Sequence, residues 1–118
     1  MISVKAGESF RGKSDEFNVY LLLGSCVGIV IEGDDFVGYT HGRNPREVEK
    51  QIDDMIRYFH RVDRVRLFGG MEGMGIIGRD NSIAGKKALN ESGLKYEDCT
   101  GIGVVIVNNY GTITLREI

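Results

Sequence analysis

The 118-residue sequence has few cysteines and histidines, no long apolar run and almost no net charge. No apolar run approaches the roughly 20 residues of a membrane-spanning helix, so we expect no insertion into a membrane. The formal net charge of −2 at pH 7 provides no basic field for nucleic acid or for an anionic lipid surface. We therefore expect neither class of partner.

Two cysteines and two histidines make a poor set of metal ligands. Cys26, His41, His60 and Cys99 lack the close sequence pairing that zinc sites use, so we expect no metal and no cofactor. Residues 1–8 lack the long apolar core of a signal peptide, which predicts a cytoplasmic protein. In that reducing compartment both cysteines are expected as free thiols.

The apolar pattern predicts one α+β domain over residues 1–118, mostly antiparallel sheet with two helices packed on it. The first helix has Asn44 as its N-cap and runs to about His60. The second helix starts near Asn81 and ends at Gly93. The residues of this second helix that are expected to face the core are Ile83, Ala84, Ala88 and Leu89. Strands are expected within the block 17–41 and at 65–68, 103–107 and 112–115.

The most informative motif is Leu-Gly-Ser-Cys-Val at residues 23–27, where a cysteine follows an apolar run. The Cys26 thiol and the His41 imidazole are the two groups that thiol-based acyl transfer requires. Gly24 lets the backbone approach a ligand closely, and the main-chain amides of Ser25 and Cys26 can face a developing oxyanion. An adjacent imidazolium would lower the pKa of Cys26 and supply thiolate at neutral pH. On residue type alone, Cys26 is more often a small buried hydrophobe.

The hairpin between the two groups decides whether they meet. A turn at residues 33–34, or a four-residue loop over residues 32–35, pairs Cys26 directly with His41 on one face of the sheet. We expect that face to be a substrate-facing surface. The opposite face is expected to belong to the core and carries Val27, Ile29, Ile31 and Phe36.

A competing motif lies in the glycine-rich segment at residues 69–78. Residues 73–78 fit G-x-G-x-x-G after a strand and before a helix, with Glu97 or Asp98 about 20 residues further on, as in a dinucleotide-binding loop. The chain has 17 glycines, so such a match arises easily by chance. The flanking strands are expected in antiparallel hairpins, unlike the parallel units of dinucleotide-binding folds. A glycine-rich wall that lets backbone pass close to a site is the structural alternative.

Four blocks of the sequence resemble the CheD family of chemoreceptor glutamine deamidases. They are residues 23–27, residues 37–41 with Pro45, residues 67–71 and residues 77–81, and their order and approximate spacing agree with the family over nearly the whole chain. The resemblance implies a layered fold and a cytoplasmic cysteine hydrolase. Its implied reaction converts glutamine side chains of chemoreceptors to glutamate through a thioester, in chemotaxis adaptation.

The resemblance also implies roles for individual residues. It places the nucleophile at Cys26 and the catalytic histidine at His41, and oxyanion donors are expected from the main chain at Gly24 and Ser25. Tyr20 stands where the family has a threonine, so its hydroxyl is the expected orienting group for His41. Chemoreceptors are the implied substrates, and a CheC-type phosphatase is an implied partner.

Two other functions stay open from the sequence. One is a non-catalytic binding or regulatory module for such a phosphatase, in which Cys26 is a relic. The other is nucleotide binding through residues 73–78.

Overall fold

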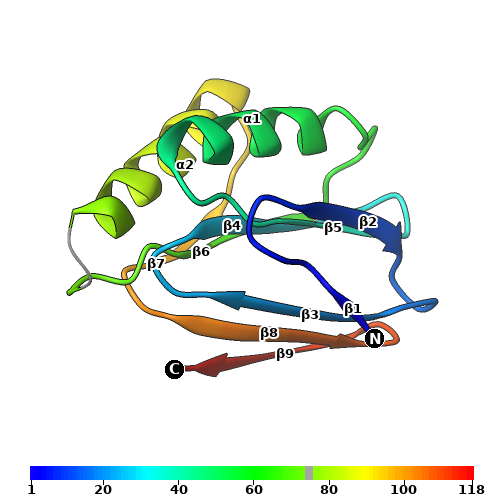
Figure 1. The fold of residues 1–118 in the computed structure, drawn as a ribbon. Coiled ribbons are helices and arrows are strands. Elements are labelled where there is room, and N and C mark those ends of the chain that lie inside the picture. Colours follow the sequence, from blue (N-terminus) through cyan, green and yellow to red (C-terminus); the bar gives the residue numbers. More distant parts are fainter. Residues whose placement is uncertain (74–75) are drawn as a thin grey trace.

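The computed structural model describes residues 1–73 and 76–118, which form three stacked layers (Figure 1). Two helices cover one face of a five-stranded sheet, and a four-stranded sheet lies against its other face. The predicted α+β class, with two helices packed on mixed, mostly antiparallel sheets, is confirmed. Neither helix of the described residues is long and apolar enough to cross a membrane.

The chain passes more than once between the two sheets. The four-stranded sheet has the order β1 (Ile2–Ser3), β3 (Asn18–Leu23), β8 (Val104–Asn109) and β9 (Thr112–Glu117). The five-stranded sheet has the order β2 (Ser9–Lys13), β5 (Phe36–Thr40), β4 (Val27–Gly33), β6 (Arg64–Gly69) and β7 (Glu97–Thr100). The helices are α1 (Pro45–Ile56) and α2 (Ile77–Ser92). Residues 24–26 therefore lie where the chain passes from one sheet to the other.

Strand β4 is buried on both faces, which gives the molecule two hydrophobic cores. Val27, Ile29 and Ile31 pack beneath the helices, as predicted. Val30 and Tyr39 belong to a second core between the sheets. The prediction that this second face is a substrate-facing surface is therefore wrong along most of β4, because the four-stranded sheet covers it.

The hairpin between β4 and β5 turns one residue later than predicted. Gly33 pairs with Phe36, and the turn residues are Asp34 and Asp35 with φ of 54° and 66°. Positive φ at both positions is what this tight hairpin turn requires. Gly33 stays in the strand. The position requires glycine because a Cβ there would lie 1.9 Å from the carbonyl oxygen of Arg61. The Asp34 carboxylate accepts hydrogen bonds from the main-chain N–H groups after α1, which fixes the turn.

Helix α1 begins as predicted and ends earlier. The Asn44 side chain accepts a hydrogen bond from the Glu47 N–H at 2.9 Å, which confirms the N-cap. The helix ends at Ile56, so the placement of His60 in its last turn is wrong. The His60 N–H instead donates to Asp34, at 2.7 Å. That hydrogen bond connects the end of the helix to the hairpin turn.

Helix α2 starts four residues earlier than predicted, at Ile77, so Asn81 lies inside it. Its end at Gly93, with φ of 75°, is confirmed, as is the burial of Ala84, Ala88 and Leu89. The prediction that Ile83 faces the core is wrong, because this side chain is 54% exposed.

Helix α2 connects two parallel strands. β6 and β7 pair in parallel, so the prediction that the strands around the glycine-rich segment form only antiparallel hairpins is wrong. Glu97, one of the two acidic residues of the dinucleotide pattern, is held by Arg64 at 2.6 Å. Within the G-x-G-x-x-G segment at 73–78, residues 74–75 lie outside the described residues.

Tyr39 provides a test of the packing between the sheets. Its side chain is buried, and its hydroxyl accepts a hydrogen bond from Asn108 on the other sheet at 2.7 Å. Burial raises the pKa of Tyr39 from 10.0 to about 12. An unfolded tyrosine ionises first, so the free energy of unfolding should fall by about 2 kcal/mol as the pH rises through this window.

Urea unfolding between pH 9 and pH 12 measures this dependence. The Tyr39→Phe variant should lose most of it, whereas Tyr58→Phe, which changes an exposed tyrosine, should retain it. Equal pH dependence in wild type and Tyr39→Phe would show that the Tyr39 hydroxyl is not buried in the folded protein.

Candidate active site

The candidate site lies at the start of β4, next to the segment that joins β5 to α1. Val27 and Gly42 exchange two main-chain hydrogen bonds, of 3.0 and 2.9 Å. The next opposed residues in this register are Cys26 and Arg43, so the predicted direct pairing of Cys26 with His41 is wrong. His41 is instead the diagonal neighbour of Cys26 on the same face, a position where cross-strand partners lie about 7–8 Å apart.

The backbones of β4 and β5 come very close to each other next to the site. Gly28 has no room for a side chain, because a Cβ there would lie 1.8 Å from the carbonyl oxygen of Thr40. The Ile29 N–H donates to the Thr40 hydroxyl at 2.8 Å. This close approach holds the strand end that carries His41 against the start of β4.

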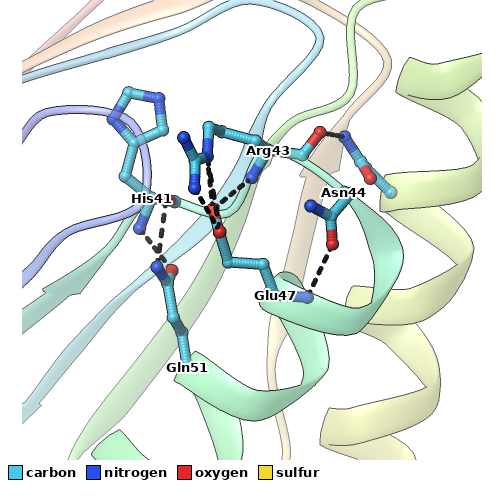
Figure 2. Close-up of polar contacts among 6 residues, drawn as sticks. His41, Arg43, Asn44, Glu47 and Gln51 are labelled. Carbon is cyan, nitrogen blue, oxygen red and sulfur yellow. Dashed lines mark hydrogen bonds and ion pairs between the residues drawn. The ribbon is translucent and has the colours of Figure 1, made fainter.

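The imidazole of His41 is buried and held by the N-terminal segment. Its Nδ1 lies 2.8 Å from the carbonyl oxygen of Val4. A carbonyl can only accept, so Nδ1 carries a proton, and in the neutral ring Nε2 keeps the free lone pair. The main chain of His41 is bound by Gln51, and the ring points away from that side chain (Figure 2). His41 is therefore set in the tautomer that a general base acting through Nε2 needs.

The Tyr20 side chain does not reach His41. It lines a hollow of about 580 Å³ on the outer face of the four-stranded sheet, while its strand neighbours Val19 and Leu21 point inward. The prediction that its hydroxyl orients His41 is therefore wrong. Tyr20 contributes through its main chain, because its carbonyl accepts from the Val4 N–H at 2.9 Å. Strict alternation along β3 was the sequence signal that could have excluded the hydroxyl.

The thiol of Cys26 is half-buried at the edge of the core between the sheets. Burial raises the pKa of this thiol, and the Glu47 carboxylate raises it further. The Arg43 guanidinium and the N–H of Cys26 itself oppose this by lowering the pKa. The prediction of a preformed thiolate at neutral pH is therefore contradicted. A thiol in this environment needs a base to remove its proton before the sulfur can act as a nucleophile.

The carbonyl groups around Cys26 are all turned toward the protein. Gly24 O accepts from the Met71 N–H at 2.9 Å, and Cys26 O accepts from the Gly70 N–H at 3.0 Å. Asn81 donates to Ser25 O. In the described part of the chain, no oxygen accepts a hydrogen bond from the N–H of Ser25 or Cys26. These two N–H groups therefore remain available to an oxyanion, the role predicted for this segment.

The glycine pair at the end of β6, Gly69 and Gly70, makes this arrangement possible. A Cβ at Gly69 would lie 2.1 Å from the carbonyl oxygen of Cys26, and both Gly69 and Gly70 have positive φ. These glycines form a wall against which the Cys26 segment lies. That role matches the structural alternative given for the glycine-rich segment.

An ion pair beside Cys26 was not predicted as part of the site. The Arg43 main-chain N–H, Nε and Nη2 all donate to the Glu47 carboxylate, at 3.0, 3.0 and 2.8 Å (Figure 2). The hydrogen bond from Arg43 lowers the pKa of Glu47, so Glu47 remains ionised. The ion pair can be recognised as part of the site only in the observed register, because that register places Arg43 opposite Cys26.

The arrangement has the chemical parts of a shallow acyl-transfer site. It offers a thiol, a buried imidazole with a defined tautomer, and two N–H groups that donate to no oxygen of the described residues. Among residues 1–73 and 76–118, no three His, Cys, Asp or Glu side chains gather to hold a metal ion. The 580 Å³ hollow lies on the far sheet and is not lined by Cys26 or His41. A side chain that protrudes from a larger substrate suits such a site better than an enclosed small molecule.

The opposing charges of Arg43 and Glu47 give a test of this geometry. In a Cys99→Ser background, the pH dependence of alkylation reports the ionisation of Cys26. Glu47→Gln should move the midpoint to lower pH, because a negative charge near the thiolate is removed, and Arg43→Gln should move it to higher pH. Asp54→Asn, which neutralises another carboxylate of α1, should leave it in place. Shifts in the same direction for Glu47→Gln and Arg43→Gln would contradict the geometry.

No model of a known protein family matches the chain, and a search of curated proteins gave no significant match. The function therefore has to be inferred from the residues around Cys26 and His41.

Proposed function

We propose that this protein is a cysteine-dependent amidohydrolase that converts glutamine side chains of chemoreceptor proteins to glutamate in the cytoplasm. The observation that carries the proposal is the fixed tautomer of His41 on the same face as Cys26. A ring whose Nδ1–H is held by a carbonyl presents Nε2 as a base, and a thiol with a raised pKa needs such a base.

The proposed reaction has two halves. His41 Nε2 takes the proton of the Cys26 thiol while the sulfur attacks Cδ of the glutamine side chain. The N–H groups of Ser25 and Cys26 stabilise the tetrahedral oxyanion, and the imidazolium protonates the departing ammonia. His41 then deprotonates a water, which attacks the thioester carbonyl and releases glutamate and the Cys26 thiol.

The choice of substrate rests on the resemblance to the CheD family, and the spatial arrangement of the four blocks supports it. Cys26 lies in the first block, and its carbonyl is bound by Gly70 of the third block. His41 ends the second block, and Asn81 of the fourth block donates to Ser25. Blocks separated by up to 56 positions thus meet around one thiol.

A second candidate function is a non-catalytic binding module for a CheC-type phosphatase. The observation that favours it is the raised pKa of the half-buried Cys26, since a relic cysteine needs no activation. The two functions differ in what happens to a receptor glutamine when the protein is present.

The test is incubation with purified chemoreceptor signalling domains, followed by mass spectrometry of their peptides. The wild-type protein should convert specific glutamines to glutamates, and Cys26→Ala should abolish the conversion. His41→Ala should reduce the rate by about 10²- to 10⁴-fold, the usual contribution of a general acid–base group.

The chain offers a matched control for each variant. Cys99→Ser changes the other free cysteine, and His60→Ala changes the other histidine, which lies outside the site. Both should retain the wild-type rate. No conversion in any of several receptors, together with binding of the phosphatase, would establish the binding module instead.

A further inference from the structure

Asn81 of α2 contacts the two chain segments that form the candidate site. Its side-chain Nδ2 donates to the carbonyl of Ser25 at 3.0 Å and to the carbonyl of Arg43 at 3.1 Å. The side chain is fully buried. The Asn81 amide therefore joins Ser25, the residue before Cys26, to Arg43, the residue opposite Cys26.

These two hydrogen bonds lie where the strand pairing stops. Val27 and Gly42 exchange the last main-chain hydrogen bonds of this strand pair. Beyond that point the Arg43 N–H turns to Glu47, and no main-chain hydrogen bond joins the two segments further out among the described residues. Asn81 of α2 therefore connects the two segments at the point where main-chain hydrogen bonds of the sheet no longer do so.

The burial of Asn81 also argues that its amide hydrogens matter. Its Oδ1 is buried and has no hydrogen-bond partner among the described residues. A buried acceptor without a donor is destabilising, and an apolar side chain that only filled space would avoid this cost. The Nδ2 hydrogen bonds are what this position gains from an asparagine.

We propose that Asn81 is the positioning residue of this site, whose side-chain amide holds the Cys26 segment in register with the segment that carries His41 and Arg43. Its catalytic meaning rests on the proposed function. The positioning role itself does not rest on that function, because it concerns where Cys26 lies relative to Arg43.

The wild-type protein allows a first measurement. Both Nδ2 hydrogens of Asn81 are in hydrogen bonds, so NMR should find that they exchange with solvent at least about tenfold more slowly than those of Asn90. Asn90 is a matched control, since it lies exposed on the same helix. Equal exchange rates for the two side chains would overturn the proposal without any variant having to fold.

Variants test the effect on the thiol. In a Cys99→Ser background, Asn81→Leu keeps the side-chain volume and removes the donors, while Asn90→Leu is its control. Asn81→Leu should move the pH midpoint of Cys26 alkylation to lower values, because the released segment loses its burial and moves away from the Glu47 carboxylate, the two largest influences that raise the pKa of this thiol. Adding Arg43→Gln should then cause little further shift. A folded Asn81→Leu protein with the wild-type midpoint would contradict the proposal.

Deamidation separates this proposal from the proposed function. If the protein is a deamidase, Asn81→Leu should lower kcat by about ten- to a hundredfold with little change in KM, as expected for a misplaced nucleophile. If the wild type does not deamidate receptors, the exchange and alkylation measurements still decide whether Asn81 positions Cys26. A lower kcat in Asn81→Leu, together with equal exchange rates for Asn81 and Asn90 in the wild type and an unchanged alkylation midpoint in the variant, would refute the positioning role of Asn81 and leave the deamidase in place.

Discussion

The candidate site depends on one pair of main-chain hydrogen bonds, between Val27 and Gly42. This pair sets the register in which Arg43 faces Cys26 and His41 lies diagonally on the same side. The register is fixed at a distance by the turn at residues 34–35, where the Asp34 carboxylate accepts hydrogen bonds from the segment after α1. It is fixed nearby by Gly28, which lets the Thr40 carbonyl approach. A shift by one residue would move Cys26 and His41 to opposite faces.

The electrostatics of the site follow from this register. Burial keeps the Cys26 thiol protonated, and the charges of Arg43 and Glu47 act on it in opposite directions. The Val4 carbonyl holds the ring of His41 without adding a charge beside it. In the proposed reaction, the thiolate forms only when the imidazole takes the thiol proton, and a protonated thiol is protected from unspecific chemistry until then.

The sequence predicted the elements of the fold better than their register. The N-cap at Asn44 and the C-cap at Gly93 depend on local chemistry, and both are confirmed. The sequence places Gly33 in the turn, because glycine tolerates the positive φ of a turn. The reason for a glycine in the strand is the Arg61 carbonyl that lies against it, and only the tertiary structure shows this contact. The choice of Cys26 and His41 came from residue type and from the family resemblance. Arg43 and the Val4 carbonyl could not be found from the sequence, since their roles depend on long-range pairing.

The most direct measurement of the central claim is whether one reagent can bridge Cys26 and His41. A dihaloacetone alkylates a thiol first and then a nearby imidazole, leaving a three-carbon link between the sulfur and a ring nitrogen. Peptide mapping of the treated protein should find Cys26 joined to His41 through Nε2, the nitrogen that the Val4 carbonyl leaves free. Alkylation of Cys26 alone, or a link from Cys26 to another residue, would contradict the proposed partnership of thiol and imidazole.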